Sequence, residues 1–117
     1  MELGLRGKIA IVTGANAALM NMTKALGDEG APHHILVNAI HPGPIRTARW
    51  DSLMEGIGAE QGRSPEEVEA DWMKDNPLKR PGETHEVASL AVFLASERAS
   101  YINGVTVPVD GGAIRCI

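Results

Sequence analysis

The stretch ILVNAIHPGPIRT, residues 35–47, decides the fold class of this chain. Its first part, residues 35–40, is an apolar run that predicts a short buried strand. The triplet Pro42-Gly43-Pro44 ends that run and predicts a stiff turn. Aromatic residues make up only 3% of the chain, so the core must be built from aliphatic side chains and methionine. Such a core suits helices packed on a parallel sheet.

Two further apolar runs complete the expected sheet. Residues 8–12 predict a strand that Thr13-Gly14 ends in a tight turn, and residues 105–109 predict a last strand. Because Pro108 cannot donate to a sheet ladder, it is expected either in a strand at the edge of the sheet or at the end of its strand. Residues 18–26 place apolar side chains at helical spacing. A helix there would make a right-handed crossover between the first two strands.

The polar region between residues 46 and 80 predicts two helices. Residues 49–58 predict a loose one. Ser64-Pro65-Glu66-Glu67 predicts the start of the other, because Ser64 suits the N-cap and Glu67 can close a capping box. A further amphipathic helix is expected over residues 87–96. The predicted order is β-α-β-α-α-α-β, which is an α/β fold.

Composition limits the classes of partner and compartment. The formal net charge is −4, from 11 Lys+Arg and 15 Asp+Glu. This balance argues against nucleic acid or an anionic membrane as the main partner. A single cysteine, Cys116, cannot form an internal disulfide, and residues 1–8 lack an apolar signal core. A cytoplasmic protein without a membrane span is expected.

No metal site is expected. The chain has four histidines, and no cysteine or carboxylate cluster joins them. The adjacent pair His33 and His34 cannot easily face one ion. Asp110 near the C-terminus is expected to tie the last turn rather than to perform chemistry.

Four segments in order resemble the short-chain dehydrogenase/reductase family. Residues 7–15 resemble its first strand and the start of its glycine-rich turn, and residues 17–26 resemble the helix that carries and follows its catalytic Tyr-x-x-x-Lys motif. Residues 35–47 resemble its sixth strand and the cofactor loop that follows. Residues 94–112, which end in Asp-Gly-Gly, resemble its C-terminal helix and last strand. The resemblance covers nearly the whole chain.

The resemblance implies a partial Rossmann-like, doubly wound fold with a small, mostly parallel sheet of about three strands. Residues 1–117 are expected to form a single truncated domain, with residues 1–15 as the first strand and turn and residues 16–117 as the C-terminal part of the family fold. The chain jumps from just after the first strand to just after the Tyr-x-x-x-Lys motif. The first and sixth strands, which are not neighbours in the full family, can then pair directly, in the order first, sixth, last.

The resemblance also implies NAD or NADP as the cofactor. In the family, the glycine-rich turn holds the pyrophosphate, and here Thr13 and Gly14 begin it, but Ala18 and Met20 stand where the next glycines belong. The family's loop after the sixth strand contacts the nicotinamide end of the cofactor. Its counterparts here are Pro42, Gly43, Ile45 and Thr47. Because the phosphate turn is incomplete, cofactor binding by this chain is in doubt, and the choice between NAD and NADP cannot be read.

No catalytic residue is predicted. Carbonyl reduction needs a group that protonates the developing alkoxide, and the only tyrosine, Tyr101, has Val105 rather than a lysine four residues on. Tyr101 matches a structural segment of the family, and a packing role is expected for it. Trp50 and Trp72 fall in what resembles the family's substrate lid, where packing is also expected.

The resulting hypothesis is an NAD(P)-dependent short-chain oxidoreductase by resemblance, inactive as written. Two alternatives stay open: a non-catalytic interaction or oligomerisation fragment, and an ordinary active reductase whose middle segment is absent from the recorded sequence. A sheet of three strands leaves apolar surface uncovered, so the expected partner is a second copy or a full-length relative.

Overall fold

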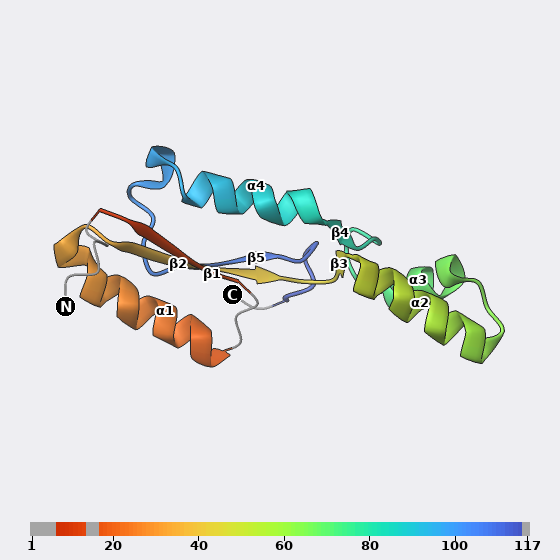
Figure 1. The fold of residues 1–117 in the computed structure, drawn as a ribbon. Helices are drawn as coiled ribbons and strands as arrows, with labels where there is room; N and C mark the ends of the chain where they lie inside the picture. Colours follow the sequence, from red (N-terminus) through yellow and green to blue (C-terminus); the bar gives the residue numbers. More distant parts are fainter. Residues whose placement is uncertain (1–6, 14–16, 116–117) are drawn as a thin grey trace. The chain divides into compact units, whose positions relative to one another are not determined.

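The computed structural model describes residues 7–13 and 17–115 and divides into two compact units (Figure 1). The first unit combines the N-terminal part of the chain, through Pro42, with Val87–Pro108. The second unit combines Gly43–Glu86 with the C-terminal part from Val109. Each unit therefore consists of two segments that are distant in the sequence.

A three-stranded sheet forms the centre of the first unit. Its strands are β1 (Ile9–Thr13), β2 (Leu36–Pro42) and β5 (Thr106–Val109), in the order β1-β2-β5. β1 is parallel to β2, with Thr13 opposite Ile40. The predicted pairing of the first strand with the second is thus confirmed, as is the edge position of the strand that contains Pro108.

β2 is the central strand, and its buried part contains one polar side chain. Residues 37–40 are all buried, and Asn38 is fully so. The Asn38 amide donates to the carbonyl oxygen of Ile102 at 3.0 Å, and its oxygen accepts from the backbone N–H of Val105 at 3.3 Å. A buried polar group costs little when it is paired in this way, so Asn38 links β2 to the segment that leads into β5.

The helix α1 (Ala17–Gly30) packs against β2. A Cβ on Gly27 would lie 2.9 Å from the Cα of Gly104, so only glycine permits this approach. Asn103 joins the two elements, since its side chain donates to the carbonyl of Gly27 and accepts from the N–H of Val37, both at 2.9 Å. Helix α1 is followed by the short 3₁₀ helix Ala31–His33.

Helix α4 (Thr84–Leu94) begins in the second unit and continues into the first. Figure 1 shows its Val87–Leu94 part on the side of the sheet opposite to α1. A 3₁₀ helix, Glu97–Ala99, then leads toward β5. Leu94 and Ala99 are fully buried, which anchors this connection.

The second unit is a helical hairpin with a two-stranded sheet. Its helices are α2 (Ala48–Gln61) and α3 (Pro65–Trp72), and its strands are β3 (Ile45–Arg46) and β4 (Gly82–Glu83), which are parallel. The core consists of Trp50, Met54, Val68 and Met73, with Ile57 packed against it. The two strands were not predicted, because two residues are too few to show a strand pattern.

Both hairpin helices have defined ends. α2 is longer than the loose helix predicted over residues 49–58: Thr47 caps its start, and Gly62, at a φ of 64°, ends it. The capping box predicted at Ser64 is confirmed. The Ser64 hydroxyl accepts from the N–H of Glu67 at 3.2 Å, and the Glu67 carboxylate accepts from the N–H of Ser64 at 3.0 Å.

The aromatic residues show one confirmed prediction and one that is wrong. Trp50 is buried and meets Trp72 edge-on, with ring centroids 5.9 Å apart, as expected for packing. The side chain of Tyr101, in contrast, is fully exposed. Two neighbours make the inward contacts of this turn: Ala99 is buried, and the carbonyl of Ile102 accepts from the side-chain amide of Asn38. Tyr101 therefore points outward.

Candidate functional site

The predicted cofactor residues begin at one edge of the first unit's sheet. Because β1 and β2 are parallel and Thr13 pairs with Ile40, both strands end toward the same edge, where Pro42 closes β2. Ligands of open α/β sheets bind at the carboxyl ends of the strands. Thr13 is exposed there, and Gly14 lies outside the described residues.

Gly43 follows Pro42 and is held by the C-terminal turn of the second unit. Its N–H donates to the carbonyl of Val109 at 3.0 Å. A Cβ at this position would lie 2.7 Å from both the Cα and the Cβ of Asp110. The space beside Gly43 is therefore occupied by Asp110 of the same chain.

Ile45 presents a pair of backbone groups. The carbonyl of Pro44 accepts from the N–H of Gly82 at 2.9 Å, and Ile45 is the residue paired with Gly82 in the β3–β4 ladder. In a parallel ladder, Gly82 bonds to the residues before and after Ile45, so the N–H and C=O of Ile45 point away from β4. Ile45 thus offers one donor and one acceptor side by side, which matches a primary carboxamide.

Thr47 acts as the N-cap of α2. Its hydroxyl oxygen accepts from the N–H of Trp50 at 3.3 Å, and its carbonyl accepts from the N–H of Asp51 at 3.0 Å. The residue is exposed, and its hydroxyl hydrogen can still donate outward. A cap of this type contributes about 1 kcal/mol to the helix, so Thr47 has a structural role whether or not a ligand binds.

The residues predicted to contact a cofactor divide between the two units: Thr13 and Pro42 belong to the first, and Gly43, Ile45 and Thr47 to the second. Ile45 and Thr47 offer groups that suit the carboxamide of a nicotinamide ring. At the phosphate end, Ala18 is exposed and Met20 is half-buried in the first part of α1. Glycines there let a backbone approach a pyrophosphate closely, and these side chains occupy that space. The turn between β1 and α1, residues 14–16, lies outside the described residues.

Arg46 is the electrostatic centre of the second unit. Its guanidinium lies 2.6 Å from the carboxylate of Glu69, 3.4 Å from that of Glu83 and 3.6 Å from that of Asp51. The hydrogen bond with Glu69 raises the pKa of Arg46 above its usual value. Arg46 therefore ties β3 to α2, α3 and β4 at one point.

Glu69 connects Arg46 to the aromatic core. One carboxylate oxygen accepts from Arg46, and the other accepts from the indole N–H of Trp50 at 2.7 Å. Burial alone would raise the pKa of Glu69, but the hydrogen bonds from Trp50 and Arg46 and the charge of Arg46 lower it below its usual value. Glu69 is thus an ionised carboxylate near neutral pH.

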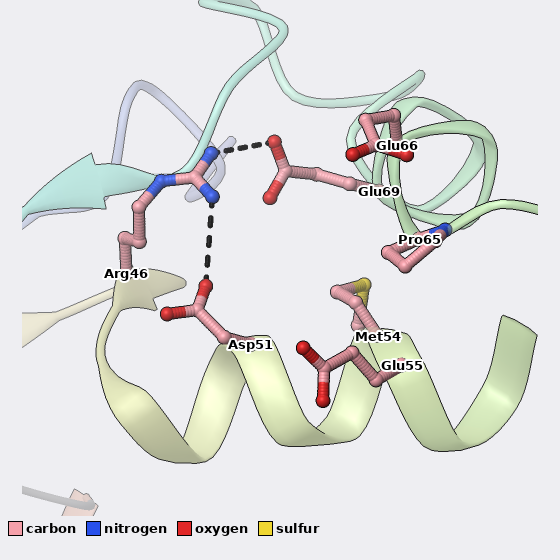
Figure 2. A pocket seen from close by; sticks show the side chains of 7 residues that line it. All are labelled: Arg46, Asp51, Met54, Glu55, Pro65, Glu66 and Glu69. Carbon is pink, nitrogen blue, oxygen red and sulfur yellow. Dashed lines mark hydrogen bonds and ion pairs between the residues drawn. The ribbon is translucent and has the colours of Figure 1, made fainter.

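A pocket of about 300 Å³ opens beside this pair (Figure 2). Figure 2 shows Arg46 directed at Asp51 and Glu69, with further carboxylates on α2 and α3 around the hollow. The lining residues are Arg46, Asp51, Met54, Glu55, Pro65, Glu66 and Glu69. The pocket therefore carries an excess of negative charge, and its side chains include no nucleophilic hydroxyl, thiol or amine.

Metal binding finds no support within residues 7–13 and 17–115. No group of three or more histidine, cysteine, aspartate or glutamate side chains there could hold an ion. In the same residues, no helix combines the length and apolar character needed to cross a bilayer.

The sequence did not predict two links of the second unit. Arg46 lay within the quoted loop, but nothing in the spacing of residues 46 and 69 predicts that they meet. Asn76 also carries no sequence signal for its contact, in which its amide donates to the carbonyl of Asp110 at 2.8 Å. The predicted role of Asp110 is confirmed, because its carboxylate accepts from the N–H groups of Gly112 at 2.9 Å and Ile114 at 2.8 Å.

Comparison with known proteins agrees with this architecture. Residues 5–113 match the family model described as enoyl-(acyl carrier protein) reductase. The NADPH-dependent reductase BacG of Bacillus subtilis (strain 168) is 41% identical over 102 residues, which cover 87% of this chain and 39% of that protein. Levodione reductase of Leifsonia aquatica is 36% identical over 112 residues, which cover 93% of this chain and 40% of that protein.

Solved structures show the same relationship. The crystal structure of L-sorbose reductase from Gluconobacter frateurii, complexed with NADPH and L-sorbose, matches with a TM-score of 0.89 at 28% identity. That match covers 97% of this chain and 50% of the other. The chain thus spans about 40% of the length of these curated relatives and half of the solved structure. On the evidence of the family model, the relatives and the shared fold, this chain belongs to the short-chain dehydrogenase/reductase family.

Proposed function

We propose that this chain is an oxidoreductase of the NAD(P)-dependent type by descent that does not transfer hydride on its own. The observation that carries the proposal is the placement of its one tyrosine. Tyr101 lies outside the helices, fully exposed, with Val105 four residues on. A tyrosine acts as the proton donor to an alkoxide only when a neighbouring cation lowers its pKa and a substrate is held beside it.

The cofactor loop supports a narrower binding function. Ile45 and Thr47 are proposed to recognise the carboxamide of a nicotinamide ring, and Gly43 and Pro42 to shape the loop. Thr13 and Gly14 are proposed remnants of the phosphate turn. Because Ala18 and Met20 fill the positions of the remaining glycines, the phosphates and adenosine of NAD or NADP are expected to add little affinity.

A turnover assay tests the first proposal. The purified chain, with its mass of 12.4 kDa verified by intact mass spectrometry, is assayed with NADH and NADPH and a set of ketones, diketones and sugars, and in reverse with alcohols. A full-length family reductase is assayed alongside. No rate above buffer is expected. A rate that scales with the concentration of this chain would overturn the proposal, and a larger mass would identify the material as an ordinary reductase with its middle segment.

A titration tests the loop separately. Amide resonances of Ile45 and Thr47 are followed while nicotinamide mononucleotide or NADPH is added. Both ligands are expected to shift these resonances with affinities within about threefold of each other, because the phosphate end contributes little. Binding of NADPH at least 100-fold tighter than the mononucleotide would contradict the absence of a phosphate cradle.

A second candidate function, assembly with another polypeptide, is favoured by exposed apolar side chains in the first unit. Met22 and Leu26 on α1 are 46% and 39% exposed. Apolar surface of this kind usually marks an interface. The proposed partner is a second copy or a full-length relative, in the reducing cytoplasm that suits a single cysteine.

A further inference from the structure

One surface of the first unit combines a free strand edge with an apolar helix flank. Within the described residues, β1 pairs with β2 alone and stands at the end of the sheet. The carbonyl of Lys8 accepts from the N–H of Leu36 at 3.2 Å. Backbone groups alternate in direction along a strand, so those of Ile9, Ile11 and Thr13 face away from β2. They form an edge that can accept another strand.

The flank of α1 on the same side is apolar. Gly27 contacts Gly104, and a Cβ on Gly104 would lie 3.1 Å from the side chain of Lys24, so this side of the helix faces the segment leading into β5. Met22 and Leu26 are each two residues from Lys24, which is about 200° around a helix. They therefore point to the β1 side of the sheet, and both are exposed.

We infer that this surface pairs with the same surface of a second copy, β1 against β1 in antiparallel orientation, to form a continuous six-stranded sheet. The sequence of β1 is uncharged and self-complementary. With Ile11 on the two-fold axis, Ile9 of one copy lies opposite Thr13 of the other. All three edge-facing residues then exchange backbone hydrogen bonds, and no like charges oppose each other.

The charges of α1 favour this orientation. The helix has no acidic residue in its first turn and no basic residue in its last turn, where Asp28 and Glu29 stand instead. The acidic residues of the last turn oppose the helix dipole, and the first turn leaves its positive end uncompensated. A two-fold axis perpendicular to the sheet places the two copies of α1 antiparallel on the same face. The acidic end of each helix then approaches the N-terminal end of the other, and the Met22–Leu26 flanks face each other.

The expected interface is small. A strand of five residues is about 17 Å long, and one strand edge with one helix flank buries about 1,000 Å² in total, at the low end for a specific complex. The dimer is therefore expected to dissociate at about micromolar concentrations. It uses a surface other than α4 and β5.

Sedimentation equilibrium of the full chain from about 1 to 300 µM tests the inference. The unmodified chain and Val92→Glu, the control on α4, are expected to double in mass as concentration rises. Met22→Glu/Leu26→Glu is expected to stay monomeric, with circular dichroism unchanged. The inference would be overturned if the chain stayed monomeric at all concentrations, even if it bound a full-length relative. It would also be overturned if Val92→Glu dissociated the dimer and Met22→Glu/Leu26→Glu did not.

Hydrogen exchange separates the strand edge from the helix flank. The amides of Ile9, Ile11 and Thr13 are expected to exchange at least tenfold more slowly at 300 µM than at 1 µM. The amide of Val12, directed at β2, is expected to change less. Equal exchange of the edge amides at both concentrations, in a sample that sediments as a dimer, would place the interface elsewhere and reject strand pairing. The test does not depend on cofactor binding or turnover.

Discussion

The side-chain amide of Asn76 donates to the backbone carbonyl of Asp110 at 2.8 Å, and its oxygen lies 2.7 Å from the position that a Cβ on Gly111 would occupy. Asn76 is nearly buried, and its oxygen also accepts from the N–H of Leu78. One residue at the end of the hairpin thus determines the shape of the Asp110-Gly111-Gly112 turn.

Replacing Asn76 with alanine is expected to lower the free energy of unfolding by about 1–3 kcal/mol, because the carbonyl of Asp110 and the N–H of Leu78 each lose a hydrogen bond to this buried side chain. Urea unfolding followed by circular dichroism measures the loss. Asp75→Ala is the matched control, since the Asp75 carbonyl that accepts from Arg115 is retained. An equal loss in both variants would contradict the specific role of Asn76.

Gly111→Ala is expected to destabilise through two effects that a double mutant separates. Gly111 has a φ of 66°, where a side chain is strained, and its Cβ would clash with Asn76. The strain costs about 1 kcal/mol and remains in any background. In the Asn76→Ala background the clash disappears, so Gly111→Ala is expected to cost less by about 1 kcal/mol or more. Additive effects would show that the clash is relieved elsewhere.

Gly43→Ala and Gly56→Ala are expected to change stability in opposite directions. A Cβ on Gly43 would lie 2.7 Å from the backbone of Asp110, whereas one on Gly56, within α2, meets nothing within 4 Å. Gly56→Ala is expected to stabilise by about 0.5–1 kcal/mol, because alanine has the higher helix propensity. Gly43→Ala is expected to destabilise by about 2 kcal/mol or more. Thermal unfolding of both variants provides the comparison, and a neutral Gly43→Ala would show that the loop can move from Asp110.

Glu69 is expected to make the second unit sensitive to acid. Its folded-state pKa is lowered, so its contribution to stability is present above the unfolded pKa, near 4.5, and is lost as the pH falls through the lower folded value. Glu69→Gln is expected to lower stability at pH 7 and to flatten this dependence. Trp50 emission in a Trp72→Phe background reports the local change, since Trp50 donates to Glu69. A pH profile unchanged by Glu69→Gln would contradict this assignment.

Glu86 is expected to titrate at unusually low pH. Hydrogen bonds from Arg80, at 2.8 Å to each oxygen, and from the N–H of Glu83 lower the pKa of Glu86 from 4.5 to about 2. Its stabilising effect is thus complete above pH about 4.5 and is lost as the pH falls toward about 2. Carbon-detected NMR measures the midpoint directly.

The control for this titration is Arg80→Ala, which is expected to return the Glu86 midpoint most of the way toward 4.5, because the first cause of the shift is removed. Lys74→Ala removes an exposed cation elsewhere in the unit and is expected to leave the Glu86 midpoint unchanged. Because the Glu86 side chain is only half-buried, added salt is expected to weaken the shift. A midpoint that ignores Arg80→Ala would assign the shift to the backbone contact with Glu83 instead.

Most of the sheet could be predicted from the sequence because its signals are local. The apolar runs at residues 8–12, 35–40 and 105–109 mark the strands, and Pro108 fits the edge position of the last one. The capping box at Ser64 is equally local, since donor and acceptor are three residues apart. Where one side chain and its neighbours in sequence decide the structure, the prediction is confirmed.

The candidate site depends on contacts between distant residues, which a single sequence does not reveal. Arg46 meets Glu69 across 23 positions, and Asn76 meets Asp110 across 34. Tyr101 shows the opposite error: its resemblance to a structural segment predicted packing, yet in this chain its side chain meets solvent. The pattern identifies the residue type, but only the fold determines what surrounds it.

The parallel pairing of β1 with β2 has a consequence for how such chains arise. In an α/β sheet every strand enters from the same end, because each is returned by a helix. When whole strand–helix repeats are absent, the remaining strands still point the same way. Ile9 can therefore pair with Leu36 in parallel orientation, although the two strands are not neighbours in the full family fold. Architectures of this kind can therefore keep a parallel sheet when a whole number of strand–helix repeats is absent.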